Sequence, residues 1–324
     1  DKDYYEYDST DFLISRFLPN LATYQVLSQL NRADVAQKAA LEKSINQAIQ
    51  TLGSAQHPDG GWGWWSREET NPYVTAYVVF GIAQAQQAGF TINADVLQRA
   101  VDYLKTQLES PTLKQSTWHK NRQVFILYAL ATAGKPDASQ NAQYFTARDQ
   151  LDTYAQALLA LTLAAGDPQD TRVKTLLSDL NSTAVVSATG THWQERNAPD
   201  YYNMNTDLRT TALSLLAFAR LQPDNPQNPN IVRWLMVARN IKGIWRSPQE
   251  TVWSLLALSE WLRATGELKA NYAYQVLVNG QRVQSVNVTD ANVTEQQRTD
   301  IAIAELFSEQ ANRVSFEHGS GSGS

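Results

Sequence analysis

The chain contains no cysteine, and it has no excess of positive charge. The first absence excludes disulfides, thiolate nucleophiles and thiolate metal sites. The second follows from 27 Lys and Arg against 32 Asp and Glu, a formal net charge of -5. With no basic field to hold phosphates, nucleic acid is a poor candidate partner. No apolar run reaches the length of a membrane span.

Phosphate loops and metal-ligand spacings are missing as well. No glycine-rich phosphate loop occurs, and the four histidines lie far apart in the sequence at His57, His119, His192 and His318. Neither a His-x-x-x-His pair nor the spacing of a calcium loop is present. We therefore expect neither a metal site nor a cofactor.

What the chain does have is a recurring helix that is apolar on nearly all its faces, a pattern that predicts burial on most sides. Five copies are evident: Thr75–Ala83, Val124–Gly134, Tyr154–Gly166, Thr211–Ala219 and Thr251–Ser259. Together with Phe12–Asn31 they make six expected inner helices, at spacings typical of helical repeats. A ring is the simplest arrangement that buries them all.

Amphipathic segments between these runs predict outer helices. They lie at residues 34–53, 93–108, 139–151, 171–180 and 230–239. Six inner and five outer helices predict a mainly α protein, an (α/α)6 toroid of the terpenoid cyclase-like kind. The long polar segment Ser182–Thr206 interrupts the pattern, and loops of this length are usually functional or carry a small hairpin.

After Gly266 the hydrophobic period changes from helical to alternating. Asn279-Gly280 between two alternating runs is a strong hairpin signal, and Thr299–Leu306 and Arg313–Phe316 could supply two more strands. We thus expect a toroid over residues 1–266, a β segment of an adjoining β domain over 267–318, and a Gly/Ser linker or tag over 319–324. We expect the chain to be a piece of a longer protein.

The N-terminal residues resemble a known segment. Tyr5-Glu6-Tyr7-Asp8-Ser9-Thr10-Asp11-Phe12 and the following Ser15-Arg16-Phe17-Leu18-Pro19 are similar, without a gap, to the thioester segment of bacterial α2-macroglobulins. That segment reads Tyr-Pro-Tyr-Gly-Cys-x-Glu-Gln, two residues, then Ser-Arg-Phe-Leu-Pro. The run Pro58–Trp65 and the helix Glu250–Leu258 also look like this family. The resemblance implies a thioester-domain-like α/α toroid flanked by β domains.

The same resemblance places Ser9 where the family has the thioester cysteine, Asp11 where it has Glu and Phe12 where it has the acyl-donating Gln. Serine could form only a much less reactive ester, and Phe12 offers no acyl carbon. By this comparison the domain is non-catalytic and carries a degenerate thioester. The family implies a periplasmic, cell-surface or secreted parent that traps proteases, contacts neighbouring β domains, and reaches a membrane only through its other parts.

Some thioester proteins use a downstream histidine in acyl transfer, and His119 is the candidate by spacing, although an ordinary loop histidine is the simpler interpretation. Trp62, Trp64 and Trp193 precede inner helices and could face a ligand, although packing of the ring's end explains their placement better. We expect no metal ligands among the site residues.

Two other classes of function stay open. One is a carbohydrate-active (α/α)6 enzyme, which would need two carboxylates across a cleft. The loops before the inner helices offer acidic residues for it: Asp59, Glu68, Glu69, Glu195, Asp200 and Asp207. The other is a toroidal protein-binding module that contacts its partner through Ser182–Thr206. Cyclase chemistry is disfavoured, because neither Asp-x-Asp-Asp nor Asp-Asp-x-x-Asp occurs.

Overall fold

The computed structural model describes residues 9–29, 35–195, 200–266, 271–289, 292, 295, 297–303 and 306–322. It divides into two compact units, one up to Trp261 and the other from Leu262. The division falls within the last α-helix of the described chain. That helix ends at Thr265, next to the boundary expected at residue 266.

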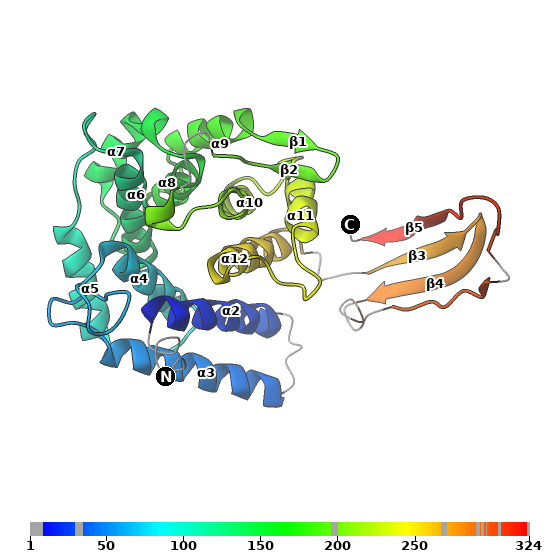
Figure 1. Ribbon diagram of the computed structural model, residues 1–324, viewed down its shortest axis with the longest axis horizontal. Helices are drawn as coiled ribbons and strands as arrows, with labels where there is room; N and C mark the ends of the chain where they lie inside the picture. The colour runs from blue at the N-terminus through cyan, green and yellow to red at the C-terminus, as the bar shows by residue number, and fades with distance from the viewer. Residues whose placement is uncertain are drawn as a thin grey trace. The chain divides into compact units, whose positions relative to one another are not determined.

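The first unit is the expected helical ring (Figure 1). Its inner helices are α2 (Thr10–Gln29), α4 (Pro72–Gln87), α6 (Thr117–Thr132), α8 (Thr153–Gly166), α10 (Asp207–Leu221) and α12 (Pro248–Thr265). Its outer helices are α3 (Val35–Ser54), α5 (Ala94–Thr106), α7 (Ala138–Thr146), α9 (Arg172–Ser182) and α11 (Asn228–Val237). Each helix that the sequence predicts is therefore present, and the predicted fold class is confirmed.

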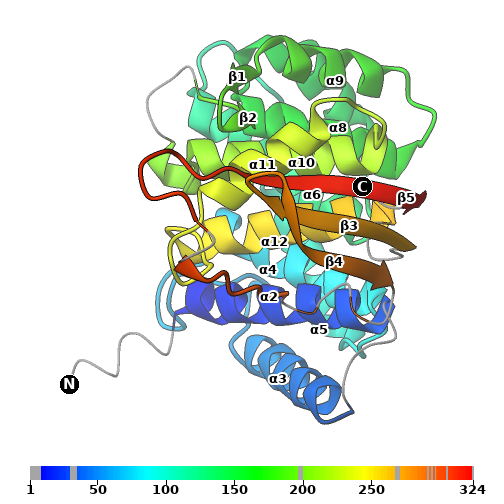
Figure 2. The same ribbon diagram turned by 90° about the vertical axis from the view of Figure 1, so that its right-hand side faces the viewer.

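The inner helices follow one another around the ring. Consecutive members from α2 to α10 pack together, and each outer helix packs beside an inner one. Both views show α3 alongside α2, outside the ring (Figure 1, Figure 2). Polar contacts join α12 to both of its neighbours, because Gln249 donates to Asp11 of α2 and Arg220 of α10 lies 2.9 Å from Glu260.

Helix α4 shows why the sequence forms these elements. Asn71 is its N-cap, with the side-chain oxygen 2.9 Å from the amide of Tyr73, and Pro72 provides the fixed φ that suits a first helical position. From Tyr73 to Ala83 every residue is buried. Full burial of a single large apolar side chain is worth about 1.5–3 kcal/mol, so packing rather than helix propensity holds this helix.

Two local details differ from the expectations, and the small hairpin that a loop as long as Ser182–Thr206 can carry is present. Helix α6 begins at Thr117, seven residues before the apolar run expected from Val124, so its first turn is polar. The expected outer helix 139–151 ends at Thr146, and a short 3-10 turn η1 (Arg148–Gln150) follows it. Segment Ser182–Thr206 carries a two-stranded hairpin, β1 (Val185–Ser187) and β2 (Gly190–His192), and a second 3-10 turn η2 (Tyr201–Asn203).

The second unit is a three-stranded antiparallel sheet in the order β4-β3-β5, built from β3 (Asn271–Val278), β4 (Gln281–Thr289) and β5 (Val314–Ser322). The Asn279-Gly280 turn has φ of 53° and 82°, as a type I′ hairpin requires. The strand expected at Arg313–Phe316 exists and continues through Gly319 to Ser322, within the Gly/Ser stretch.

The strand expected at Thr299–Leu306 is wrong for the part that is described, since residues 297–303 and 306 carry no strand. Both edges of β3 are already occupied, one by β4 and the other by β5. The segment contacts β4 through a side chain instead, the hydroxyl of Thr299 donating to the amide oxygen of Gln284.

Within the described ranges, none of the helices combines the length and hydropathy of a membrane span.

Candidate functional site

The first turn of α2 brings Ser9 and Phe12 together. The hydroxyl of Ser9 accepts from the amide of Phe12 at 3.2 Å, and the Ser9 carbonyl accepts from the amide of Leu13 at 3.1 Å. Ser9 is thus the N-cap of the helix, and its side chain satisfies an amide that would otherwise lack a partner. The two residues lie one turn apart, with the oxygen of one against the backbone of the other.

The aromatic loop before α4 holds this turn in place. Ser9 forms an isolated antiparallel bridge with Trp65, and the amide of Thr10 donates to the carbonyl of Trp64 at 2.9 Å. On the other side, the guanidinium of Arg16 lies 5.5 Å from the centre of the Phe12 ring. The phenyl group of Phe12 is therefore partly covered by a cation of its own helix.

Asp11 connects the same turn to three other parts of the ring. Its carboxylate accepts at 2.9 Å from the side-chain amide of Gln249, at the start of α12. The Gln249 carbonyl accepts from the hydroxyl of Tyr73 at 3.1 Å, and its NH2 group lies 3.0 Å from the sulfur of Met204. Burial raises the pKa of Asp11, and the bond from Gln249 partly offsets the rise.

Two of the tryptophans expected as ligand contacts are completely buried. The indole N–H of Trp62 donates to the carbonyl of Leu52 at 2.8 Å, and that of Trp193 to the carbonyl of Leu180 at 2.9 Å. Each fastens a loop to the end of the preceding outer helix. Both side chains are closed off from solvent, and their packing agrees with the simpler interpretation.

The neighbouring tryptophans differ in their exposure. Trp64 is partly buried, with its ring centre 6.1 Å from that of Tyr73, and Trp65 is exposed. Trp245 repeats the arrangement of Trp62 before α12, its indole donating to the carbonyl of Leu235 at 2.9 Å. Among the five tryptophans that precede inner helices, Trp64 and Trp65 are thus the ones with accessible surface beside Ser9.

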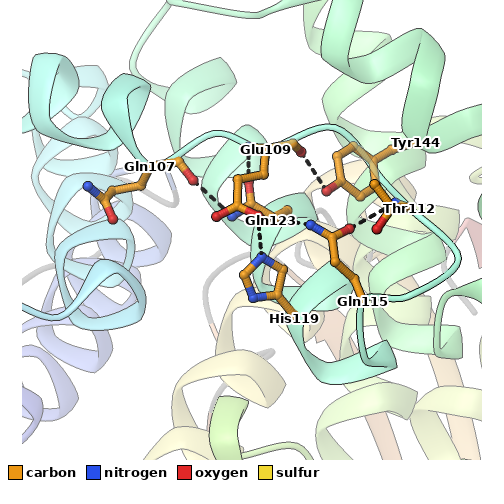
Figure 3. Close-up of polar contacts among 7 residues, drawn as sticks. All are labelled: Gln107, Glu109, Thr112, Gln115, His119, Gln123 and Tyr144. Carbon is orange, nitrogen blue, oxygen red and sulfur yellow. Dashed lines mark hydrogen bonds and ion pairs between the residues drawn. The ribbon is translucent and has the colours of Figure 1, made fainter.

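His119 lies in the first turn of α6 rather than in a loop (Figure 3). Its Nε2 is 3.2 Å from the carboxylate of Glu109, and its ring meets that of Trp118 edge-on at 5.5 Å. Figure 3 shows Glu109 as the centre of this group, since its carboxylate also accepts from Gln115 and its carbonyl from Tyr144. The contacts described for His119 thus brace the loop between α5 and α6.

The loop carboxylates mostly serve the fold. Glu195 accepts from the amides of Thr153 and Tyr154 at 3.0 and 3.2 Å and so caps α8. Asp200 is buried and accepts from the hydroxyl of Tyr154 at 2.8 Å, while Asp207 accepts from the amide of Glu195. The remaining acidic residues expected at this end are exposed at the surface: Asp59, Glu68 and Glu69. Among the described residues no group of His, Cys, Asp or Glu could hold a metal ion.

The chain also matches a known protein family along most of its length. The sequence model described as "A-macroglobulin TED domain" matches residues 7–127 and 125–261, which is most of the chain. The chain belongs to this family. The resemblance to α2-macroglobulins stated from the sequence is therefore confirmed.

Curated relatives of this TED domain include "Alpha-2-macroglobulin" of Thermotoga maritima, 37% identical over 86 residues that are 25% of this chain and 6% of that protein. "Thioester-containing protein 1 allele S1" of Anopheles gambiae is 21% identical over 81% of this chain and 20% of its own length. The chain thus spans at most about a fifth of these proteins.

Solved structures show the same fold. Salmonella α2-macroglobulin reacted with methylamine superposes with a TM-score of 0.65 at 18% identity, over 88% of this chain and 18% of that one. Trypsin-activated α2-macroglobulin of Escherichia coli gives 0.63 at 17% identity, over 90% and 20%. These similarities support the toroid with its appended β segment.

The sequence did not single out two residues, Gln249 and Arg209, that organise this end of the TED domain. Gln249 joins Asp11, Tyr73 and Met204, although 238 positions separate it from Asp11. Arg209 is fully buried inside the ring. A charged residue in the first turn of an otherwise apolar helix was the available signal for Arg209, whereas nothing near Gln249 in the sequence marks it.

Proposed function

We propose that this chain is the TED domain of an α2-macroglobulin-like protease trap that has lost its thioester. The observation that carries the proposal is the first turn of α2. There the hydroxyl of Ser9 lies 3.2 Å from the amide of Phe12, at the two positions that the family's thioester segment gives to Cys and Gln. The place of the bond is kept, while its two reacting groups are replaced.

The replacement removes the chemistry. A thioester joins a sulfur to the acyl carbon of a glutamine side chain three residues on, and the side chain of Phe12 has no carbonyl. Ser9 also uses its hydroxyl to cap α2. We infer that the domain forms no covalent bond to a protease or a surface, and that it is not an enzyme.

The parent protein would then inhibit proteases by caging or by a conformational change. Its partners are proteases and its own neighbouring β domains, and it acts outside the cytoplasm, in the periplasm, at the cell surface or after secretion. The family match, and relatives about four times as long as this chain, support this view.

Intact mass after methylamine treatment tests the proposal. In the double variant Ser9→Cys, Phe12→Gln the sulfur and the acyl group return, so we expect loss of the mass of ammonia on folding and then uptake of one methylamine. The unaltered chain should do neither. Ser9→Cys alone is the matched control, because it has the thiol without an acyl donor.

Two results would contradict the proposal. Methylamine uptake by the unaltered chain would mean that it holds a reactive acyl group. An inert double variant that is otherwise folded would mean that Ser9 and Phe12 do not occupy a thioester site. A further variant that adds Asp11→Glu separates loss of the site from the effect of the shorter acidic side chain at position 11.

A second candidate is the protein-binding module. Tyr201 and Tyr202 are 79% and 63% exposed within the long loop before α10, and tyrosine is a frequent contact residue in protein interfaces. This reading is compatible with a non-covalent trap. By contrast, the engagement of Glu195 and Asp200 in the fold gives the carbohydrate-active alternative no support.

A further inference from the structure

Inside the ring, five of the six inner helices contribute to one group of side chains, which we call the central cluster. It consists of Tyr73, Tyr77, Phe125, Tyr154, Arg209 and Trp253, all at most 2% exposed. The guanidinium carbon of Arg209 lies 5.1 Å from the ring centre of Tyr154, 5.6 Å from that of Trp253 and 5.9 Å from that of Phe125. A positive charge is thus enclosed by aromatic rings.

Several hydrogen-bond donors of this cluster have no acceptor. Arg209 uses its Nη1 to donate to the carbonyl of Asn203 at 2.8 Å, but its Nε and Nη2 have no partner in the described part of the chain. The same holds for the indole Nε1 of Trp253 and the hydroxyl of Tyr77. Each buried unsatisfied group costs about 1–3 kcal/mol, and more when it is charged, so such atoms rarely remain without a partner.

The two carboxylates that act on the tyrosines of the cluster already accept hydrogen bonds. Asp200 receives bonds from Asn121, Asn203 and the hydroxyl of Tyr154. Asp11 receives the amide of Gln249, whose own carbonyl receives Tyr73. No ion pair of Arg209 occurs among the described residues. The guanidinium charge therefore has aromatic faces around it and no carboxylate in contact.

We propose that the central cluster binds a small inorganic anion, of the size of chloride or bromide, between Arg209, Tyr77 and Trp253. The orphaned groups are donors, and arginine and tryptophan cannot accept. A water molecule would accept from these donors but would not compensate the buried positive charge. An anion accepts several hydrogen bonds and also compensates the buried positive charge.

Diffraction from crystals grown with sodium bromide in place of chloride gives the direct test. We expect an anomalous bromide peak within hydrogen-bonding distance of the Arg209 guanidinium. A fully occupied water position without anomalous signal there would overturn the proposal. So would an interior in which side chains of the chain itself approach the four orphaned donor atoms.

Solution measurements give an independent test with matched variants. Tyr77→Phe and Trp253→Phe each remove one orphaned donor and keep a ring. Tyr144→Phe and Trp193→Phe remove the same kinds of atom from places outside the cluster, where the hydroxyl donates to Glu109 and the indole to Leu180. The melting temperature of each is followed against sodium bromide, with sodium gluconate at equal ionic strength as the reference.

We expect the apparent bromide affinity to fall on the order of tenfold in Tyr77→Phe and Trp253→Phe, the effect of losing one hydrogen bond to a charged group. The two control variants should keep the affinity of the unaltered chain, although they melt at lower temperatures. Equal bromide responses in all four variants would refute the site. We leave Arg209 unchanged, because its Nη1 also holds the loop at Asn203.

Discussion

Trp193 and Trp253 are both completely buried, yet they are placed in two different kinds of environment. Trp193 lies in a loop at the end of the ring, and its indole donates to the carbonyl of Leu180. Trp253 lies inside the ring on α12, and its indole N–H has no partner among the described residues. The end of the ring at Trp193 is thus closed by a satisfied contact, whereas the donors of Arg209, Tyr77 and Trp253 inside the ring include four atoms without a partner in the described part of the chain.

The comparison distinguishes parts that support the fold from parts that are available for binding. Trp62, Trp193 and Trp245 make the same bond to the end of three different outer helices. Repetition of one contact at three places indicates a structural fastening. In the central cluster, burying the unpaired donors of Arg209, Tyr77 and Trp253 costs folding free energy. Their contacts, unlike those of the three tryptophans, are not repeated around the ring.

The largest loss of stability is expected when one of the tryptophans that join a loop to an outer helix is truncated. Trp193→Ala deletes a fully buried ring that packs on Phe218 with centres 5.9 Å apart. Such truncations usually cost about 3–5 kcal/mol, because a cavity remains where the ring was. Urea unfolding followed by circular dichroism measures the loss. Trp65→Ala, which truncates an exposed tryptophan, is the control and should cost far less. Similar losses in the two variants would mean that Trp193 does not fasten the ring.

A smaller difference in the free energy of unfolding is expected between Trp193→Phe and Trp253→Phe in halide-free buffer. Both variants lose similar ring volume, but Trp193→Phe also loses the bond to Leu180. Trp253→Phe removes a donor that has no partner in the chain. The free energy of unfolding should therefore fall by about 1 kcal/mol more in Trp193→Phe. An equal or larger loss in Trp253→Phe would show that its indole does have an acceptor.

Most of the helical framework was predictable from the sequence. Helices such as α4 and α8 are apolar on nearly every face, so the residues within each helix are enough to predict its burial. The packing of Trp62 and Trp193 was also readable, from their repeated position before inner helices. The Ser9–Phe12 turn could be placed through its resemblance to a family segment. In each case the signal lies within a few residues.

Long-range convergence was not predictable. Gln249 meets Asp11 across 238 positions and Tyr73 across 176, and no local pattern connects them. The strand expected at residues 299–306 is absent from the described residues 299–303 and 306. Its alternation permits a strand, and which strands pair with β3 is again decided by long-range contacts, here with β4 and β5. His119 was expected in a loop because the first turn of α6 is polar, and polar residues at a helix start look the same in sequence as a loop.

The smallest expected effect is a pH dependence of the free energy of unfolding. It comes from Glu195, a hydrogen-bonded carboxyl group at the end of the ring. Burial raises the pKa of Glu195 above its ordinary 4.5, and the charge of Asp152 adds to the rise, while bonds from Thr210 and from the α8 amides oppose it. A raised pKa means that the folded state binds the proton more tightly than the unfolded state. The stability that this provides is complete below pH 4.5 and is lost as pH rises through the folded pKa.

In Glu195→Gln this titration is absent, so the stability gap between the unaltered chain and the variant should narrow as pH rises, by about 1.4 kcal/mol for each unit of pKa shift. Asp11, whose pKa burial also raises, is present in both proteins and cancels. Urea midpoints at a series of pH values measure the gap, with Glu68→Gln, a change of an exposed carboxyl, as the control. A gap that widens with pH would mean that the hydrogen bonds to Glu195 from Thr153, Tyr154, Thr210 and Asn205 outweigh its burial. Its carboxylate would then be ionised in the fold, as a helix cap ordinarily is.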